Sequence, residues 1–130
     1  SNFHSKKIGS KHKIHNLKKV SRDVLINIFS DSRLLIMCSK SEGMPNIIAE
    51  CMSVGTPTIS PKVGGIPDII KNQINGVLLD DFNTDSFVSE LENILRNPEI
   101  WQFYSQMCIN QSNLYSEDKI GPKFEILLNS

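Results

Sequence analysis

The sequence predicts an α/β fold with a Rossmann-like parallel sheet and flanking helices. Short apolar runs alternate with segments of helical periodicity along most of the 130 residues, and this alternation is typical of parallel α/β sheets. The run Leu34–Cys38 is continuously apolar, as expected of a strand that is buried on both faces. Four strands with intervening helices are expected, which is about two thirds of a Rossmann-like layer.

The first half of the chain is expected to contain two strands and two helices. A short strand lies within Lys13–Val20, and a helix follows Ser21 with four apolar residues on one face, Val24, Leu25, Ile28 and Phe29. After the strand Leu34–Cys38, Pro45 suits the first position of a helix, because its missing N–H costs nothing there. That helix should end before Gly55 and bury Ile47, Ile48, Cys51 and Met52.

The second half of the chain adds two strands and mainly helices. Strands are expected at Pro57–Ser60 and Gly76–Leu79, with a turn at Gly64-Gly65 and a helical turn at Asp68–Ile70. A helix begins at Thr84 and breaks at Asn97-Pro98. Extra C-terminal helices are expected over about 98–128, the last of them at Lys119–Leu128. Three aromatic residues at helical spacing are expected in the core: Trp101, Phe103 and Tyr104.

Composition favours one domain, or a piece of one, with no affinity for nucleic acid. The hydrophobic content of 39% suffices for one ordinary core, and the formal net charge is zero. Residues 1–22 nevertheless carry seven bases and no acid. They form either a surface for phosphate or anionic lipid or the solvated edge of a domain. The second reading is favoured, because no aromatic residues interleave the lysines.

The cysteines and histidines do not indicate a metal site. Cys38, Cys51 and Cys108 each lie in an apolar run without C-x-x-C spacing, as reduced core cysteines do. The three histidines are close to the start of the chain and far from any cysteine, so no metal is expected. No signal peptide and no membrane-spanning run is evident. A cytoplasmic protein is therefore expected, and the chain is expected to begin inside a longer protein.

The candidate site is the loop after the strand Leu34–Cys38. Ligands of open parallel sheets bind beyond the carboxyl ends of the strands, and Ser39–Asn46 leaves such an end and opens a helix. The helix start offers free N–H groups at Met44, Asn46 and Ile47, which favour a bound anion by about 0.3–1 kcal/mol. Gly43 has no Cβ, so a ligand can approach the backbone closely.

Two glutamates, Glu42 and Glu50, flank this helix start with seven residues between them. A carboxylate accepts two hydrogen bonds at once, which suits the vicinal hydroxyls of a sugar or a ribose, at about 1.5–3 kcal/mol for each bond. Two alternatives remain open. The pair could be a loop acid and a solvent-facing helix acid, or a glycosidase-like acid/base pair, which needs carboxyl groups about 5–10 Å apart.

The ordered motifs around these glutamates resemble the retaining glycosyltransferases of the GT-B fold, glycosyl transferases group 1. The similar segments are S-K-S-E-G-M-P-N-I-I-A-E (39–50) with the E-x7-E motif, C-M-S-V-G-T-P (51–57), V-G-G-I-P-D-I-I (63–70) and N-G-V-L-L (75–79). They keep the family's order over roughly half of the chain. Cys51 and Ser53 replace the usual alanines, and Asp68 stands where glutamate is commoner, so its role is open.

The resemblance implies that the chain is part of a C-terminal donor-binding domain. It assigns the hydroxyls of the transferred hexose to Glu42, as the catalytic residue that orients the sugar, and the ribose diol to Glu50. The backbone that faces the sugar and the diphosphate is assigned to Ser39, Gly43, Met44, Pro45, Asn46 and Ile47. The substrate implied is a nucleotide-diphosphate sugar, transferred with retention and without a metal or other cofactor.

The resemblance also implies parts that precede this chain. An acceptor-binding N-terminal domain would take a glycan or a lipid-linked acceptor, and an upstream Arg and Lys pair would neutralise the diphosphate. Peripheral association with the inner face of the membrane and a role in polysaccharide biosynthesis are compatible with this. The chain alone is expected to be inactive. The alternatives are a non-catalytic nucleotide-sugar-binding subunit and a nucleotide-sugar epimerase of the same architecture.

Overall fold

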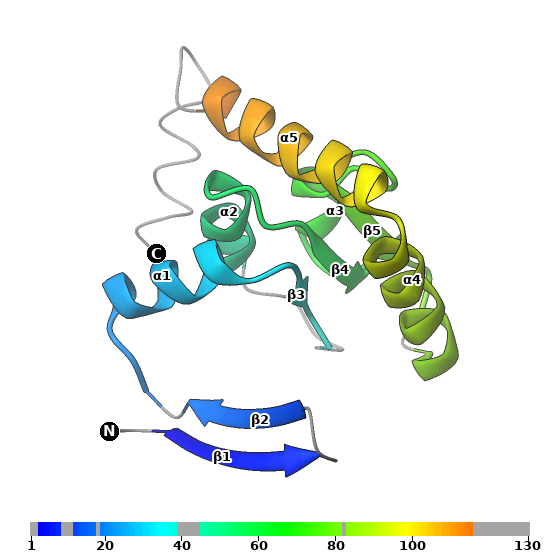
Figure 1. Ribbon diagram of the computed structural model, residues 1–130. Coiled ribbons are helices and arrows are strands. Elements are labelled where there is room, and N and C mark those ends of the chain that lie inside the picture. Colours follow the sequence, from blue (N-terminus) through cyan, green and yellow to red (C-terminus); the bar gives the residue numbers. More distant parts are fainter. Residues whose placement is uncertain (1–2, 9–11, 18, 39–44, 82, 116–130) are drawn as a thin grey trace.

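The centre of the fold is a parallel sheet of three strands. The computed structural model describes residues 3–8, 12–17, 19–38, 45–81 and 83–115. The sheet has the order β3 (Leu35–Ile36), β4 (Thr58–Pro61) and β5 (Gly76–Leu79). Ile36 is in register with Ile59, and Ile59 with Val77. The predicted α/β class with a parallel sheet is confirmed (Figure 1).

Capping and turn residues in the sequence mark where the helices begin and end. They are α1 (Arg22–Asp31), α2 (Pro45–Ser53), α3 (Ile66–Ile69), α4 (Thr84–Arg96) and α5 (Pro98–Tyr115). The Ser21 hydroxyl accepts the Val24 N–H at the start of α1, at 3.3 Å, and Asn83 caps α4 in the same way. After α2, Gly55 adopts a left-handed φ of 80° and turns the chain toward β4.

The strand expected within 13–20 does not belong to the parallel sheet. It is β2 (His12–Leu17), which pairs antiparallel with β1 (Phe3–Ile8), and Figure 1 shows this hairpin outside the sheet. The physical reason is in the sequence of β2, H-K-I-H-N-L, in which polar residues outnumber apolar ones. A strand buried on both faces would need a nearly continuous apolar run, whereas a hairpin needs only an adjacent partner.

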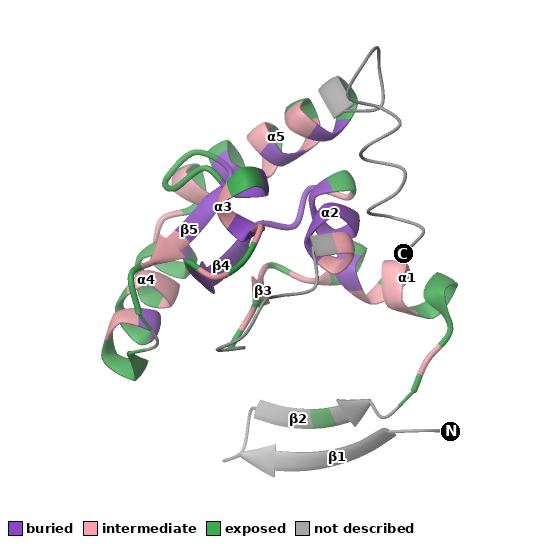
Figure 2. Cartoon of the chain, turned by 180° about the vertical axis from the view of Figure 1, so that it is seen from behind, coloured by how far each residue is buried: buried purple, intermediate pink, exposed green. Residues whose placement is uncertain are grey.

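Two apolar clusters cover the two faces of the sheet. Leu35, Met37 and Leu78 lie in one cluster with residues of α2, α3 and Cys108 of α5. Ile59, Val77 and Leu79 lie in the other, with residues of α4 and with Tyr104 and Ile100 of α5. Neighbouring residues of β5 thus enter opposite clusters, as strand geometry requires. Helix α5 contributes to both, and the buried residues concentrate in α2, β4 and β5 (Figure 2).

Several residues expected in the interior lie further out. Ile36, in the run expected to be buried on both faces, is 41% exposed, and Trp101 is only half-buried. Phe103 is 49% exposed, whereas its neighbour Tyr104 is buried, because a helix turns successive side chains by a large angle and only one of the two can face the sheet. Ile47 is half-buried. Cys38 is exposed, since it follows the end of β3, while Cys51 and Cys108 are buried as expected.

The turn before β5 depends on Asn75 and Gly76. The buried Asn75 side chain accepts the Lys71 N–H at 2.8 Å and donates to the carbonyl of Ile69. The Cys108 thiol donates to the Asn75 carbonyl, which ties the turn to α5. Gly76 then pairs with Thr58 of β4. A Cβ added to Gly76 would meet the Thr58 carbonyl oxygen at 2.5 Å, so only glycine fits here without separating β4 from β5.

The substitution Gly76→Ala is therefore expected to destabilise the chain by about 1–3 kcal/mol or more, since the clashing atom is backbone. Gly65→Ala is the matched control, because a Cβ there has nothing within 4 Å. It should change stability by no more than about 0.5 kcal/mol. Urea unfolding followed by circular dichroism measures both, and equal midpoints for the two variants would contradict the close approach of β4 and β5.

Candidate functional site

The segments that follow the three parallel strands, including the predicted site, lie at the carboxyl edge of the sheet. Because β3, β4 and β5 are parallel, the segments that follow them leave the same edge. Helix α2 starts after β3, the segment Lys62–Gly65 follows β4, and Asp80 follows β5. The ammonium of Lys62 lies 3.0 Å from the Asp80 carboxylate, so the ends of β4 and β5 are joined at this edge. Both side chains are well exposed, and such a pair contributes little to stability.

The predicted site residues divide into two groups. Ser39, Glu42, Gly43 and Met44 lie outside the described residues, so their predicted roles stay predictions. Pro45 begins α2 as predicted, and Asn46 and Ile47 follow in its first turn, both half-buried. The first turn of a helix has backbone N–H groups without intrahelical partners. The structure therefore places the amide-bearing part of the predicted site at the carboxyl edge.

Glu50 lies in the second turn of α2 and is buried. The residue is 6% exposed, so the alternative that it is a solvent-facing helix acid is wrong. Its Oε1 lies 3.2 Å from Nη2 of Arg22, the first residue of α1. A buried carboxylate is costly unless it is paired, and Arg22 supplies the charge. The Arg22 side chain is itself half exposed.

The geometry of Glu50 leaves acceptor capacity for a ligand. A carboxylate has about four lone-pair positions on its two oxygens, and in the described part of the chain Arg22 is its one ion-pair partner. The second oxygen, Oε2, has no ion-pair partner among the described residues and keeps lone pairs for hydrogen bonds. In the sequence, Arg22 is one of the seven bases of residues 1–22. Its pairing with Glu50 joins residues far apart in the chain, so no local pattern indicates it.

The segment after β4 turns sharply at the same edge. Gly64 adopts a left-handed φ of 51°, which favours glycine, and Gly65 precedes the single turn of α3. This confirms the turn expected at these two glycines. Asp68 is exposed on α3, and nothing in its surroundings assigns it a role.

The two buried thiols near the site are chemically inert. Burial, followed by the neighbouring Cys108 and Glu50, raises the pKa of the Cys51 thiol to about 12. Burial also raises the pKa of Cys108 to about 12. Both remain neutral near pH 8, and a neutral thiol is neither a nucleophile nor a metal ligand. Within the described ranges, no three His, Cys, Asp or Glu side chains are grouped to hold a metal ion. No helix in those ranges is long and apolar enough to cross a membrane.

Comparison with known proteins gives one family. The model of the family "Glycosyl transferases group 1" matches residues 2–111. An uncharacterised glycosyltransferase of Methanocaldococcus jannaschii is 29% identical over 118 residues, covering 88% of this chain and 30% of that protein. The UDP-Gal:alpha-D-GlcNAc-diphosphoundecaprenol alpha-1,3-galactosyltransferase of Escherichia coli is 30% identical over 90 residues, covering 69% of this chain and 23% of that protein. The chain thus spans less than a third of the length of these relatives.

Solved structures show the same fold. The C-terminal domain of a group 1 glycosyl transferase from Francisella tularensis superposes with a TM-score of 0.69 at 16% identity, covering 78% of this chain and 52% of that one. An Anabaena protein in complex with UDP superposes with a TM-score of 0.63 at 13% identity, covering 78% of this chain and 27% of that one.

The thiols provide a test of the packing around α2 and α5. Of the three cysteines, only the exposed Cys38 should react with Ellman's reagent in the native chain at pH 8, because the other two are buried and protonated. All three should react after unfolding in guanidinium chloride. The variant Cys38→Ser is the control, and its native form should show no rapid reaction. Rapid native labelling of that variant would contradict the burial of Cys51 and Cys108.

Proposed function

The chain belongs to the glycosyl transferases group 1 family, and from this premise we propose that it binds a nucleotide-diphosphate sugar at the carboxyl edge of its sheet. It would serve as the donor-binding part of a retaining hexosyltransferase. The observation that carries the proposal is Glu50, a carboxylate that is 6% exposed and paired with Arg22 beside the helix that starts at this edge.

In this proposal each part of the edge has one task. The free Oε2 of Glu50 accepts hydrogen bonds from the ribose diol, while Arg22 holds Oε1. The N–H groups of the first turn of α2, at Asn46 and Ile47, face the diphosphate, and the positive end of the helix dipole favours its charge by about 0.3–1 kcal/mol. Pro45 suits the first position of α2, because it has no N–H group that would need a partner there.

The remaining donor contacts are proposed from the resemblance of the sequence. Glu42 orients the transferred hexose, and Ser39, Gly43 and Met44 supply backbone near the sugar and the diphosphate. Chemistry would proceed without a metal, and stabilisation of the leaving nucleoside diphosphate by the helix amides and by upstream basic residues would drive it. The acceptor hydroxyl attacks from the face that the diphosphate leaves, so the anomeric configuration is retained.

Two of the comparisons support the donor and acceptor classes. The Anabaena protein of the same fold is in complex with UDP, which supports a nucleotide diphosphate as the ligand. The name of the Escherichia coli relative includes a diphosphoundecaprenol-linked acceptor, which supports a lipid-linked glycan. Because the chain spans less than a third of these relatives, we propose that a preceding domain binds the acceptor. Peripheral membrane association would follow from a lipid-linked acceptor.

The proposal predicts weak binding of nucleotide diphosphates to the chain itself. Titration of the ¹⁵N-labelled chain with UDP, GDP and ADP should shift the amide signals of Asn46 and Ile47, with affinity in the millimolar range. Glu50→Gln should weaken binding by about tenfold or more, because a hydrogen bond to a charged group is worth about 1.5–3 kcal/mol.

The matched control for this titration is Glu92→Gln, which removes an exposed carboxylate from α4. It should leave nucleotide affinity unchanged. Shifts confined to residues outside α2 and the segment Lys62–Gly65, or equal affinity for Glu50→Gln and the unchanged chain, would refute a donor site at this edge.

A further inference from the structure

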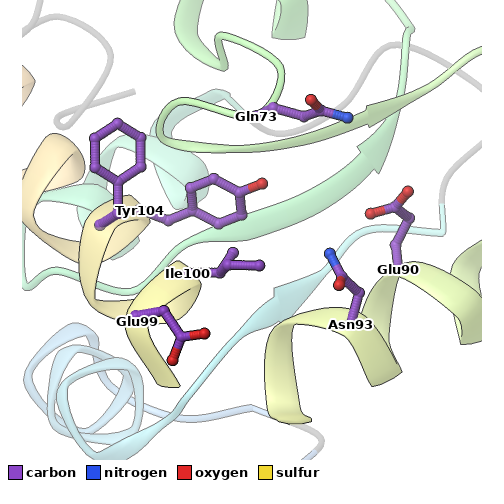
Figure 3. A pocket seen from close by; sticks show the side chains of 7 residues that line it. Gln73, Glu90, Asn93, Glu99, Ile100 and Tyr104 are labelled. Atoms are coloured by element: carbon purple, nitrogen blue, oxygen red, sulfur yellow. The ribbon is translucent and has the colours of Figure 1, made fainter. Parts of the chain in front are cut away.

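A pocket lies away from the carboxyl edge, between α4, α5 and the turn before β5. Its volume is about 360 Å³, and Gln73, Glu90, Asn93, Glu99, Phe103 and Tyr104 are among its lining residues (Figure 3). Gln73 precedes β5, so it belongs to the amino edge of the sheet, opposite to the proposed donor site. The pocket therefore plays no part in the function proposed above.

Tyr104 is the observation that indicates a ligand. The residue is 5% exposed, yet Figure 3 shows its hydroxyl pointing away from α5 into the space bordered by Gln73, Glu90 and Asn93. None of the hydrogen bonds of the described residues involves this hydroxyl. This hydroxyl is not among the buried polar atoms without a partner, so it is the accessible end of an otherwise buried side chain. It can therefore bind a polar group that enters the pocket.

The charge of the pocket selects the kind of ligand. Glu90 and Glu99 contribute two carboxylates, and Gln73 and Asn93 contribute neutral amides. None of the described lining residues is basic. Neither carboxylate forms an ion pair with a described residue. Burial raises the pKa of the Tyr104 hydroxyl, and the negative charge of the nearby Glu90 carboxylate raises it further. A phosphate or another anion would be repelled here, whereas a cation would be attracted.

The exposed ring of Phe103 also favours a cation as the ligand of this pocket. Phe103 is 49% exposed, although it is one of the largest apolar side chains in the chain. The face of an aromatic ring attracts ammonium and guanidinium groups. Carboxylates, amide oxygens, a free hydroxyl and an accessible ring together offer acceptors and a π-face, which are the groups that bind an organic cation.

We propose that this pocket binds an organic cation, namely a guanidinium or a primary ammonium group. The acceptors of Glu90, Glu99 and Tyr104 would receive its N–H donors, and the ring of Phe103 would cover its apolar part. The cation comes either from a small free amine or from an arginine or lysine side chain of a protein partner.

The test is a titration of the ¹⁵N-labelled chain with agmatine, with an acetylated and amidated Gly-Gly-Arg-Gly-Gly peptide, with glucose and with inorganic phosphate. Agmatine or the peptide should shift the signals of Asn93 and Phe103, whereas glucose and phosphate should not. Tighter binding of the peptide supports a protein partner, and tighter binding of agmatine supports a free amine. Either result supports the proposal that the pocket binds an organic cation.

Variants locate the binding in the pocket. Glu90→Gln should weaken agmatine binding by about tenfold, since it replaces a charged hydrogen-bond acceptor with a neutral one. Tyr104→Phe keeps the ring and should weaken binding several-fold. Glu92→Gln, on the same helix but outside the pocket, should leave binding within about twofold of the unchanged chain, because surface charges at a distance are screened.

Three results would overturn the proposal. The first is the absence of shifts around the pocket with either cation. The second is binding of glucose or phosphate as tight as that of agmatine, which would show that the charge does not select the ligand. The third is an equal loss for Glu92→Gln and Glu90→Gln, which would show a general charge effect. None of these results depends on whether nucleotides bind at the carboxyl edge.

Discussion

The structure depends on burying both faces of a narrow parallel sheet. With strands of two to four residues, the backbone ladder contributes few hydrogen bonds, so the apolar clusters on the two faces must hold the sheet. Each face must be covered by apolar side chains. Helix α5 contributes to both clusters, with Tyr104 in one and Cys108 in the other. Helix α2, which starts at the carboxyl edge, is held by one of these two clusters through Ile48 and Met52.

Much of this fold could be predicted because its elements have strong local signals. Gly76–Leu79 is observed as β5 with the bounds expected from its apolar run, and Pro45 marks the first residue of α2. The hairpin could not be placed, because a short half-polar run does not reveal which neighbour its backbone will pair with. The prediction that Phe103 lies in the core is wrong for a similar reason. Helical spacing identifies an apolar stripe, but packing against the sheet decides which residue at its margin is covered.

At the candidate site, too, residues close together in the sequence could be predicted, and contacts between distant residues could not. The loop, the proline and the E-x7-E spacing are contiguous, so the sequence could indicate Pro45, Asn46, Ile47 and Glu50 together. The pairing of Glu50 with Arg22 depends on how α1 packs against α2, and it appears only in three dimensions. The acidic pocket at the opposite edge was not predicted either, because its residues come from two helices and a turn that share no motif.

The pair of Glu50 and Arg22 is poorly explained by stability alone. Withdrawing a carboxylate from water costs several kcal/mol, and an apolar side chain of similar volume in such a position is often neutral or stabilising by about 1–4 kcal/mol. Arg22 is half exposed, so solvent screens part of the attraction that should offset the cost. Beside the buried Ala49 and Cys51 of the same helix, a leucine or methionine would satisfy packing. A carboxylate with one oxygen held and the other available is better matched to a ligand than to a core, which is why the proposed donor site is centred on Glu50.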